Sequence, residues 1–404
     1  MKILLVTQYF YPETFKSTDL AFELQKRGHE VTVLTGIPNY PEGKIYESYG
    51  FFKNRKQNIN GVKIIRSLLL PRGNGGGIRL FLNYYSFAFF ASIKAFFLGI
   101  SNTYDAVIVH EPSPITQFYP ALLLKKLWKT PVYFWVMDLW PESLSIAGGV
   151  KNKMVLGYYE SVVKNFYKNS EKILITSKGF RKSINEKGDF DSKIVYFPNW
   201  AEDSISEGDK NYPIPTLPEG FKVMFAGNIG EAQDLDNIMK AALELKQHKN
   251  IKFVLVGDGR KMPFVKEFIE ENQLQETVHL AGRFPVEAMA SFFNKAEVML
   301  VTLKDDPIFN LTVPAKVQAY MSASKPIVAM LNGEGAENIK ESESGFAVNA
   351  GDYKALAETI LKASELPKEE LEKLGQNARK FYEENFRMSE CITNLENILN
   401  AKNQ

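Results

Sequence analysis

Two carboxylates and two tryptophans stand close together in the segment FWVMDLWPES, residues 134–143. The acids, Asp138 and Glu142, follow an apolar run (131–137) that has the length of a buried strand. A carboxylate there can orient a hydroxyl group or support a positive charge, and aromatic rings beside it can stack on the C–H faces of a sugar. A structural interpretation is also open, in which Asp138 caps a helix opened by Pro141 and Glu142 favours its first turn.

Glycine-bearing turns follow three apolar runs in the second half of the chain. Their sequences are FAGNIGEAQD (225–234), VGDGRK (256–261) and AGRFP (281–285). Glycine lets the backbone approach a ligand closely, and the helix that follows offers unpaired N–H groups to a phosphate. With Arg260, Lys261 and Arg283 beside these turns, the pattern predicts a site for a nucleoside diphosphate.

One lysine stands in an unusual place within KDDPIFNLTVPAKVQAY, residues 304–320. Lys304 ends a strand-like run, Pro314 marks a helix start, and Lys316 falls in the first turn of that helix. A cation in the first turn opposes the helix dipole unless an anion binds nearby. We therefore expect Lys316 to neutralise phosphate charge. The alternative is a surface lysine with its ammonium group in water.

The composition narrows the classes of partner. Of the 404 residues, 45% are apolar and 24% are charged, as in an ordinary packed fold, and the net charge of +2 gives no field suited to nucleic acid. Cys391 is the only cysteine and the four histidines show no metal-ligand spacing, so neither a disulfide framework nor a metal site is expected. The acids Asp234 and Asp236 fit a helix start better than a metal.

Strand-like runs alternate with helix-period segments along the chain, which predicts an α/β fold of two doubly wound parallel-sheet domains. Ligands of such sheets bind beyond the carboxyl ends of the strands, so we expect one cleft between two facing domains. The first residues, MKILLVTQYFYPE, are expected to form a strand and not a signal peptide, which predicts a cytoplasmic protein. The strands are expected at 2–7, 29–35, 61–66, 104–110, 131–137, 172–177, 221–227, 251–259, 277–282, 296–303 and 325–330.

Prolines are dense between residues 198 and 220, where no periodic apolar pattern runs. We expect a linker at 199–220 between a first domain, 1–198, and a second domain, 221–382. The last residues, 383–404, are expected to form a helix that crosses back to the first domain.

The most apolar stretch is IRLFLNYYSFAFFASIKAFFLGI, residues 78–100. Asn83, Ser86, Ser92 and Lys94 interrupt it, which argues against a membrane span. Two interpretations are open. It is either a core helix or an amphipathic helix that faces the inner membrane with Arg79 and Lys94 at the headgroups.

Six stretches resemble the retaining glycosyltransferases of family 4: LAFELQKRGHEVTVLTG, VMDLWPESL, AGNIGEAQDLDNIMKAA, LVGDGRK, PAKVQAYMSASKPIVAMLNGEGAENI and SGFAVNAGD. The first, second and fifth look closest to the L-fucosamine transferases of surface-polysaccharide assembly. The resemblance implies the GT-B fold, with donor bound by the C-terminal domain and acceptor by the N-terminal domain, and with no metal or other cofactor.

The same resemblance implies the reaction and its place. A sugar, N-acetylated amino or 6-deoxy, would pass from a nucleotide sugar, UDP favoured over GDP, to a lipid-diphosphate-linked saccharide of polysaccharide, capsule or O-antigen assembly. The protein would work on the cytoplasmic face of the inner membrane.

The resemblance also assigns site residues by position. Asn228 and Gly230 would face the diphosphate, backbone near Gly282 would face the base, and Glu337 would lie near the ribose. Asp138 is the first catalytic candidate. The other two are Glu111, which follows the run 104–110, and Glu13, whose loop YPETFKST would close over the sugars. The full set for the donor is Asn228, Gly230, Gly257, Arg260, Lys261, Gly282, Arg283, Lys304, Asn310, Lys316 and Glu337.

Two departures from the family pattern matter. The usual pair of glutamates falls on Leu311 and Ala319, so contacts with the donor sugar must come from the backbone of FNLTV or from other side chains. The histidine often found before the aspartate of HDLWPES is Met137, which excludes a histidine base there. Retaining transfer tolerates this, because the departing phosphate oxygen can accept the proton of the incoming hydroxyl while the protein positions both substrates.

Other functional classes stay open at this point. A nucleotide-sugar epimerase can have the same GT-B architecture and would need no membrane. A dinucleotide-dependent oxidoreductase is disfavoured, because no strand precedes a complete G-x-G-x-x-G turn with an acid about 20 residues on. A membrane-binding scaffold would leave the glycine turns unexplained.

Overall fold

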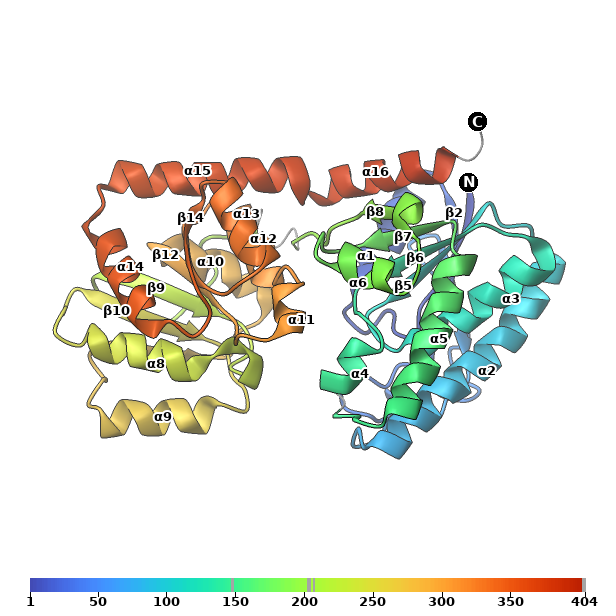
Figure 1. Cartoon of the computed structure of the whole chain (residues 1–404), viewed down its shortest axis with the longest axis horizontal. Helices are drawn as coiled ribbons and strands as arrows, with labels where there is room; N and C mark the ends of the chain where they lie inside the picture. Colours follow the sequence, from blue (N-terminus) through green and yellow to red (C-terminus); the bar gives the residue numbers. More distant parts are fainter. Residues whose placement is uncertain (147–148, 202–204, 206–207, 402–404) are drawn as a thin grey trace. The chain divides into compact units, whose positions relative to one another are not determined.

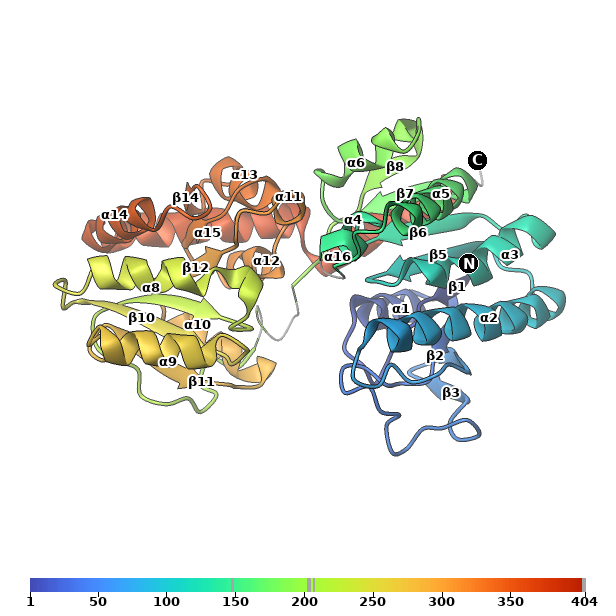
Figure 2. The same ribbon diagram turned by 60° about the horizontal axis from the view of Figure 1, so that its bottom comes forward.

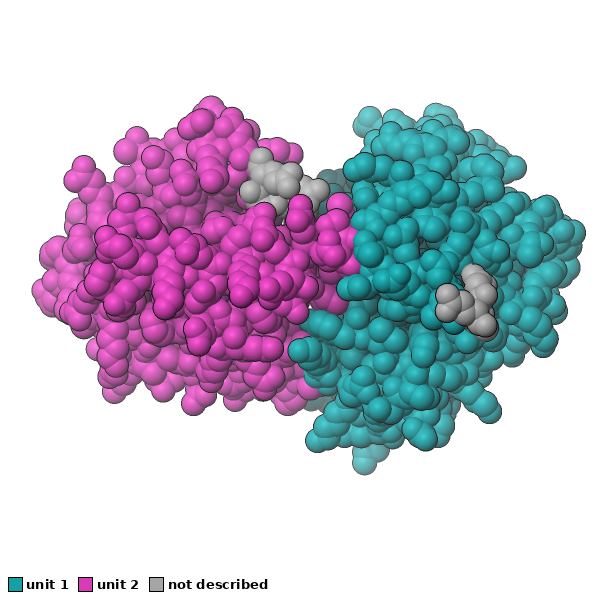
Figure 3. Space-filling model, turned by 90° about the horizontal axis from the view of Figure 1, so that it is seen from above, with its two compact units in different colours: residues 1–197, 392–404 teal, residues 198–391 magenta. Residues whose placement is uncertain are grey.

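The computed structural model describes residues 1–146, 149–201, 205 and 208–401. The chain divides into two compact units, shown in different colours in Figure 3. Unit 1 comprises Met1–Phe197 and Ile392–Gln404, and unit 2 comprises Pro198–Cys391. Each unit is a mostly parallel sheet with helices on both faces, so the α/β expectation is confirmed (Figures 1 and 2).

Unit 1 contains an eight-stranded sheet in the order β3-β4-β2-β1-β5-β6-β7-β8. All neighbouring strands are parallel except β3 and β4. The central strands are buried on both faces, which is why they stand out in the sequence as near-continuous apolar runs. The strands are β1 (Lys2–Val6), β2 (Glu30–Gly36), β3 (Lys56–Ile59), β4 (Val62–Ser67), β5 (Ala106–Glu111), β6 (Val132–Val136), β7 (Lys172–Ile175) and β8 (Ile194–Tyr196).

The helices of unit 1 include a layer of three, α2, α3 and α5, in which each packs against the next (Figure 1). Most of α16 also belongs to this unit. The helices are α1 (Lys16–Lys26), α2 (Gly77–Ser101), α3 (Tyr119–Trp128), α4 (Glu142–Ile146), α5 (Lys153–Asn169), α6 (Phe180–Glu186) and α16 (Met388–Asn400), with 3-10 turns η1 (Ile115–Phe118) and η2 (Asp191–Lys193).

Unit 2 contains a six-stranded parallel sheet in the order β11-β10-β9-β12-β13-β14. Its strands are β9 (Phe221–Ala226), β10 (Ile251–Val256), β11 (Val278–Gly282), β12 (Val298–Thr302), β13 (Ile327–Met330) and β14 (Gly345–Val348). Its helices are α8 (Leu235–Glu244), α9 (Met262–Glu271), α10 (Met289–Lys295), α11 (Pro307–Asn310), α12 (Ala315–Ser322), α13 (Glu334–Glu341), α14 (Tyr353–Glu365) and α15 (Lys368–Asn385), with 3-10 turns η3 (Glu231–Gln233) and η4 (Val286–Ala288).

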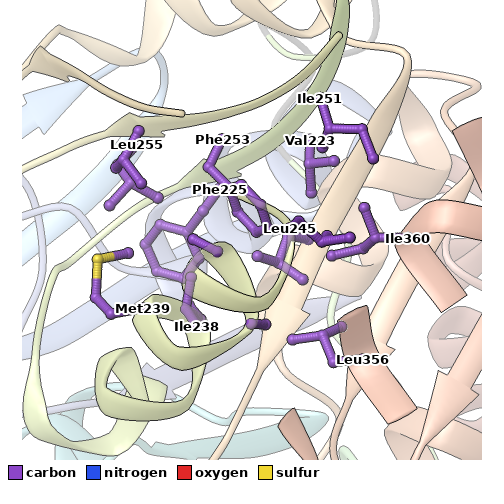
Figure 4. Close-up of a cluster of buried hydrophobic side chains, with 14 of the residues drawn as sticks. Val223, Phe225, Ile238, Met239, Leu245, Ile251, Phe253, Leu255, Leu356 and Ile360 are labelled. Atoms are coloured by element: carbon purple, nitrogen blue, oxygen red, sulfur yellow. The ribbon is translucent and has the colours of Figure 1, made fainter. Parts of the chain in front are cut away.

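One core of unit 2 joins the sheet to α8 and α14. Phe225 of β9, Ile238 of α8 and Ile360 of α14 belong to one cluster of buried side chains, and all three are fully buried (Figure 4). Burying an apolar side chain of this size contributes about 1.5–3 kcal/mol, so this cluster holds the sheet against both helices.

Three strands were not expected from the sequence: β3, β8 and β14. Each forms an edge of its sheet and is short and only partly buried. Edge strands need little apolar surface, so they lack the pattern by which the central strands were predicted.

The segment predicted as a linker, 199–220, belongs to unit 2. Ala201 is buried in a core cluster of that unit, and Tyr212 packs against the same cluster. The dense prolines therefore mark an irregular segment that covers unit 2. Positions 202–204 and 206–207 of it lie outside the described residues.

Helix α2 is not a core helix, which was one of the two interpretations of its sequence. Asn83 is buried, accepts a hydrogen bond from Gln8 Nε2 at 2.7 Å and donates one to Leu70 O at 2.6 Å, so one side of α2 is fastened to unit 1. The opposite side is apolar and exposed. Within the described residues α2 is the one helix long and apolar enough to cross a bilayer, and 28% of its most apolar stretch is buried. The exposed large apolar residues of α2 are Ile78, Phe81, Leu82, Phe89, Ile93, Phe96, Phe97 and Ile100.

Helix α16 is tied to unit 1 by one carboxylate. Glu396 accepts a hydrogen bond from Arg27 Nη1 at 2.8 Å, and its other oxygen lies 2.7 Å from His29 Nε2. Leu395 and Leu399 are buried beside it. The chain therefore returns to unit 1 near residue 392, later than the boundary at 383 that the sequence suggested.

Replacing Glu396 by Gln removes the charge from this contact and keeps the side-chain shape. We expect the free energy of detaching α16 from unit 1 to fall by about 1 kcal/mol. This value is modest because the ion pair is partly exposed. This corresponds to about fivefold faster hydrogen exchange of the amides in 388–400, measured by mass spectrometry at pH 7. The matched control is Glu372→Gln, which breaks the exposed Lys368–Glu372 pair on α15. Unchanged exchange in Glu396→Gln would contradict the anchoring role.

Candidate functional site

The glycine turns of unit 2 meet at the carboxyl ends of β9, β10 and β11. Beyond these ends lies a cavity of about 490 Å³. Peptide groups and the apolar side chains of Phe284 and Met289 share its lining, which suits a ligand with both a charged and a flat apolar part. The lining residues are Gly227, Asn228, Val256, Gly257, Asp258, Gly259, Arg283, Phe284 and Met289.

The turns touch each other backbone to backbone, and only glycine permits this. Gly257 has a φ of +142°, and a Cβ atom built on it would lie 1.9 Å from the carbonyl oxygen of Gly227. Its own N–H donates to Gly282 O at 2.8 Å. At Gly230 the neighbour is a side chain of the same turn, since a Cβ atom there would lie 2.5 Å from the Nδ2 atom of Asn228. Of the predicted residues, Asn228, Gly257 and Arg283 line the cavity, whereas Gly230 and Gly282 belong to the turns and do not line it.

Lys316 lies against this cluster without a carboxylate partner among the described residues. Its ammonium group donates to Gln233 Oε1 and lies 4.3 Å from the centroid of the Phe225 ring. Its Cε atom is so close to Gly227 that a Cβ atom there would lie 2.7 Å away. Burial lowers the pKa of Lys316 to about 7. A cation held this way, in the first turn of α12, is stabilised when an anion binds nearby.

Two other predicted lysines are already neutralised. Lys304 Nζ lies 3.1 Å from Glu231 Oε2. Lys261 Nζ lies 3.7 Å from the same oxygen and 3.1 Å from Asp236 Oδ2. These pairs also explain the acids near the start of α8, where Asp234 occupies the N-cap position and accepts from Asn237 Nδ2 at 2.8 Å. Lys261 in particular is a partner of α8 in this structure, and not an open phosphate ligand.

The remaining predicted donor residues do not line the cavity. Asn310 ends α11, donates to Asp305 Oδ1 at 3.2 Å and packs its carbonyl against Gly333. Glu337 is exposed in the first turn of α13, and Arg260 is exposed after β10. They share the carboxyl edge of the sheet with the cavity, because all six strands are parallel.

In unit 1, Asp138 follows β6 and lines a pocket of about 430 Å³ between α2, α4 and α5. Ser143 Oγ donates to Asp138 Oδ1. Burial raises the pKa of Asp138 to about 6, against the hydrogen bonds from Ser143 and from the Leu139 peptide. The lining residues are Gly77, Leu80, Phe81, Tyr84, Ser113, Asp138, Trp140, Ser143, Leu144, Val150, Val155 and Tyr159.

Glu111 lies behind Asp138 and is fully buried at the end of β5. Neither of its oxygens accepts a hydrogen bond of ordinary geometry. Burial and the charge of Asp138 raise the pKa of Glu111 well above its usual value, and nearby peptide groups of Asp138 and Ser113 oppose the shift only in part. Glu111 has no exposed surface with which to touch a substrate, so the prediction that it is catalytic is corrected.

Glu142, the second acid of the segment 134–143, has a structural role. Glu142 Oε1 accepts from Ser183 Oγ at 2.8 Å and from the buried ammonium group of Lys187. It therefore joins α4 to α6 and does not line the pocket. Of the two acids in the tryptophan segment, only Asp138 faces a site.

Glu13 is likewise structural. Its Oε1 atom accepts from the peptide N–H groups of Asn39 at 2.8 Å and Tyr40 at 2.7 Å, and Oε2 accepts from Phe10 at 3.2 Å. Burial raises the pKa of Glu13 to about 7, although these hydrogen bonds oppose the shift. Its oxygens hold two loops together and are not open to a sugar. The prediction from the sequence that Glu13 lies near the sugars is therefore corrected.

Several site residues were missed from the sequence. Phe81 and Tyr84 of α2 line the Asp138 pocket, although α2 was considered only as a core or membrane helix. The two residues are three positions apart in a helix rich in aromatic residues, and this spacing could have indicated that they share one face. Phe284 directly follows the predicted Arg283 and forms the apolar wall of the unit 2 cavity.

Two family models match the chain in succession. Residues 17–200 match the model described as "Glycosyl transferase 4-like domain", and residues 212–381 match "Glycosyl transferases group 1". Each of these two segments is thus similar to a glycosyltransferase domain. The two matches correspond closely to the two units.

Relatives of this chain include the "Probable glycosyltransferase WbjE" of Pseudomonas aeruginosa. It is 30% identical over 62% of this chain and 64% of its own length. The "Putative colanic acid biosynthesis glycosyl transferase WcaI" of Escherichia coli is 26% identical over 64% of this chain and 66% of its own length. The chain thus matches about two thirds of the length of these curated relatives.

Solved structures of glycosyltransferases share the fold. Anabaena HepE in complex with UDP has a TM-score of 0.71 at 13% identity and covers 99% of this chain and 100% of its own. The GT-B architecture expected from the sequence is thereby confirmed.

The position of Lys316 predicts a pH dependence. Because its pKa is lowered to about 7 in the free protein, the ammonium form prevails only below that pH, and a bound diphosphate stabilises this form. Affinity for UDP or GDP should fall about tenfold between pH 7 and pH 8.5, measured by calorimetry. Lys316→Met should weaken binding and show only the pH dependence of the nucleotide's own phosphate. Parallel pH profiles in both proteins would contradict this role.

Proposed function

We propose that the protein transfers a sugar from a nucleoside diphosphate sugar to a saccharide linked to a lipid diphosphate, in the assembly of a surface polysaccharide. The observation that carries the proposal is the unit 2 cavity. Glycine turns line this cavity, and Lys316 packs against Gly227 of its lining, which suits a diphosphate. UDP is favoured over GDP because HepE, which shares the fold, is solved with UDP. WcaI, named for colanic acid biosynthesis, supports a polysaccharide product.

In the proposed reaction, the bond between the anomeric carbon of the sugar and the β-phosphate oxygen breaks. The acceptor hydroxyl forms the new bond on the same face, and its proton passes to the departing phosphate oxygen, so configuration is retained. Lys316 and the peptide N–H groups around Gly257 stabilise the charge that grows on the diphosphate. We propose that no metal takes part. The described residues contain no cluster of three or more side chains suited to one.

Asp138 is proposed to orient the acceptor hydroxyl. Above a pH of about 6 it is ionised, and a carboxylate accepts a hydrogen bond from a hydroxyl group better than a carboxylic acid does. The aromatic rings of Tyr84 and Trp140 provide surfaces on which a sugar can stack.

The donor sugar is proposed to be an N-acetylated amino or 6-deoxy sugar, as in the L-fucosamine transferases that the sequence resembles. The absence of the usual glutamates at Leu311 and Ala319 leaves the backbone of α11 and the residues after it to contact this sugar. A nucleotide-sugar epimerase is not favoured, since the relatives WbjE and WcaI are named as glycosyltransferases.

The test is transfer itself. The full chain is incubated with UDP-sugars and polyprenyl-diphosphate-linked saccharides, and products are identified by mass spectrometry. Asp138→Asn should lower kcat at least about tenfold with little change in UDP affinity. The wild-type rate should fall below a pH of about 6, where Asp138 is protonated. The exposed acid of α5 gives the control Glu160→Gln. Wild-type turnover by Asp138→Asn would exclude the assigned role, and UDP release without any acceptor product would exclude transfer.

Helix α2 supports a proposed location at the cytoplasmic face of the inner membrane. Eight of its large apolar side chains are exposed, and gathered apolar side chains on a surface mark sites of interaction with membranes or proteins. The layer of α2, α3 and α5 carries seven basic residues and one acidic residue, Glu160, which suits an anionic bilayer. The basic residues are Arg79, Lys94, Lys125, Lys126, Lys153, Lys164 and Lys168.

Membrane binding can be measured by co-sedimentation with vesicles. The full chain should bind vesicles that contain phosphatidylglycerol and bind less in high salt. The double substitution Phe89→Ser with Phe97→Ser, at positions 63% and 61% exposed, should reduce binding at least about fivefold without loss of stability. The exposed side chain Phe52 lies outside α2, so Phe52→Ser is the control. Equal binding by all three proteins would contradict docking through α2.

A further inference from the structure

The pocket around Asp138 is amphiphilic. Its polar groups include Asp138, Ser113 and Ser143, together with the phenol or indole groups of three aromatic residues, whereas most of its remaining wall is apolar. Leu80 and Leu144 belong to this apolar part. A pocket for a sugar alone needs polar partners around the ring, so the extent of apolar wall points to a ligand that also has a hydrocarbon part.

The apolar wall continues onto the exposed surface. Phe81 of α2 and Val155 of α5 line the pocket, yet they are 52% and 36% exposed. Ile78 and Met154 lie near them in sequence and are 80% and 81% exposed. The pocket therefore opens at the same apolar surface that we propose for membrane docking. A hydrocarbon chain that occupies the pocket can extend past Phe81 and Val155 onto this surface.

The pocket also has features that suit an anionic head. Gly77, the first residue of the long helix α2, lines it, and the first turn of α2 contains no acid. The first N–H groups of a helix lack partners within the helix and attract anions. Independently, Trp140 lines the pocket, is 4% exposed, and has an indole N–H without a hydrogen-bond partner in the part of the chain described.

The charge of a cation, Arg72, reaches one residue of this pocket. Burial raises the pKa of Tyr84, which lines the pocket, while the charge of Arg72 opposes this shift and that of Asp138 adds to it. Both charges therefore act on one phenol group. Arg72 is further held over the ring of Tyr40, 4.8 Å from its centroid.

We infer that this pocket binds the lipid-proximal part of the acceptor, namely its diphosphate and the first isoprenoid units of its chain. The diphosphate lies toward the start of α2, and the chain leaves past Phe81 and Val155. The statement that this ligand is the acceptor rests on the proposed function. The pocket's preference for a prenyl diphosphate is independent of that function. The enzyme thus recognises the lipid itself as well as the sugar that it carries.

The first experiment is binding of farnesyl diphosphate to the full chain, measured by calorimetry with saturating UDP so that the unit 2 cavity is occupied. Binding should be at least tenfold tighter than that of inorganic diphosphate or dodecyl phosphate. Val155→Asp should weaken it at least tenfold. An acid in the first turn of α5 favours the helix, so this variant keeps its fold. Phe81→Ser gives a second test on the other wall.

The control is Phe97→Ser, which lies on the exposed side of α2 but does not line the pocket. It should leave the affinity for farnesyl diphosphate unchanged. Equal affinity in wild type and Val155→Asp, or equal binding of dodecyl phosphate and farnesyl diphosphate, would overturn the inference.

The second experiment separates this inference from the proposed function. Acceptors with the same saccharide diphosphate and either an ethyl or a farnesyl group are compared in solution without vesicles. We expect at least tenfold higher kcat/KM with the farnesyl group, and loss of this preference in Val155→Asp. Transfer at equal rates to both acceptors would overturn the inference and leave the function standing. No transfer to either, with farnesyl diphosphate still bound as above, would overturn the function and leave the prenyl site standing.

Discussion

Parallel strands end together, and this constraint organises both units. Every carboxyl strand end in unit 2 lies on one edge of its sheet, so groups far apart in sequence, such as Gly227, Gly257 and Gly282, meet there. The contact between Gly257 and the carbonyl of Gly227 leaves no room for a side chain, and the peptide groups that line the cavity are held rigidly by it. In unit 1 the same constraint puts Glu111 and Asp138 next to each other at the ends of β5 and β6.

Each candidate site contains one ionisable group whose charged form is disfavoured by burial. Lys316 has a pKa lowered to about 7, and Asp138 has a pKa raised to about 6. Both therefore change charge close to neutral pH, which is common at functional sites. Neighbouring groups of the same type, Lys261 and Glu142, are paired with opposite charges and have structural tasks. The distinction between the two kinds of group depends on partners, not on residue type.

The sequence was sufficient for the fold class and for most central strands, because buried parallel strands carry continuous apolar runs. It also predicted the glycine turns after the strands and the place of Lys316 in the first turn of a helix, whereas their role in phosphate binding stays a prediction. It failed where a side chain's role depends on distant partners. In the sequence, Glu13 and Glu111 come after strand-like runs, as Asp138 does. Only the structure shows that the oxygens of Glu13 accept hydrogen bonds from peptide groups and that Glu111 is fully buried. The short edge strands lacked a pattern altogether, and the exposure of α2 could not be told from its composition.

The return of α16 to unit 1 has a consequence for how the protein is made on the ribosome. Unit 1 begins at the N-terminus, yet Leu395, Glu396 and Leu399 are part of its packed surface. The first 197 residues therefore emerge and collapse without their last helix, and all of unit 2 must be synthesised before that helix arrives. Until then the surface of unit 1 around Arg27 and His29 stays uncovered, and a chaperone can bind to it.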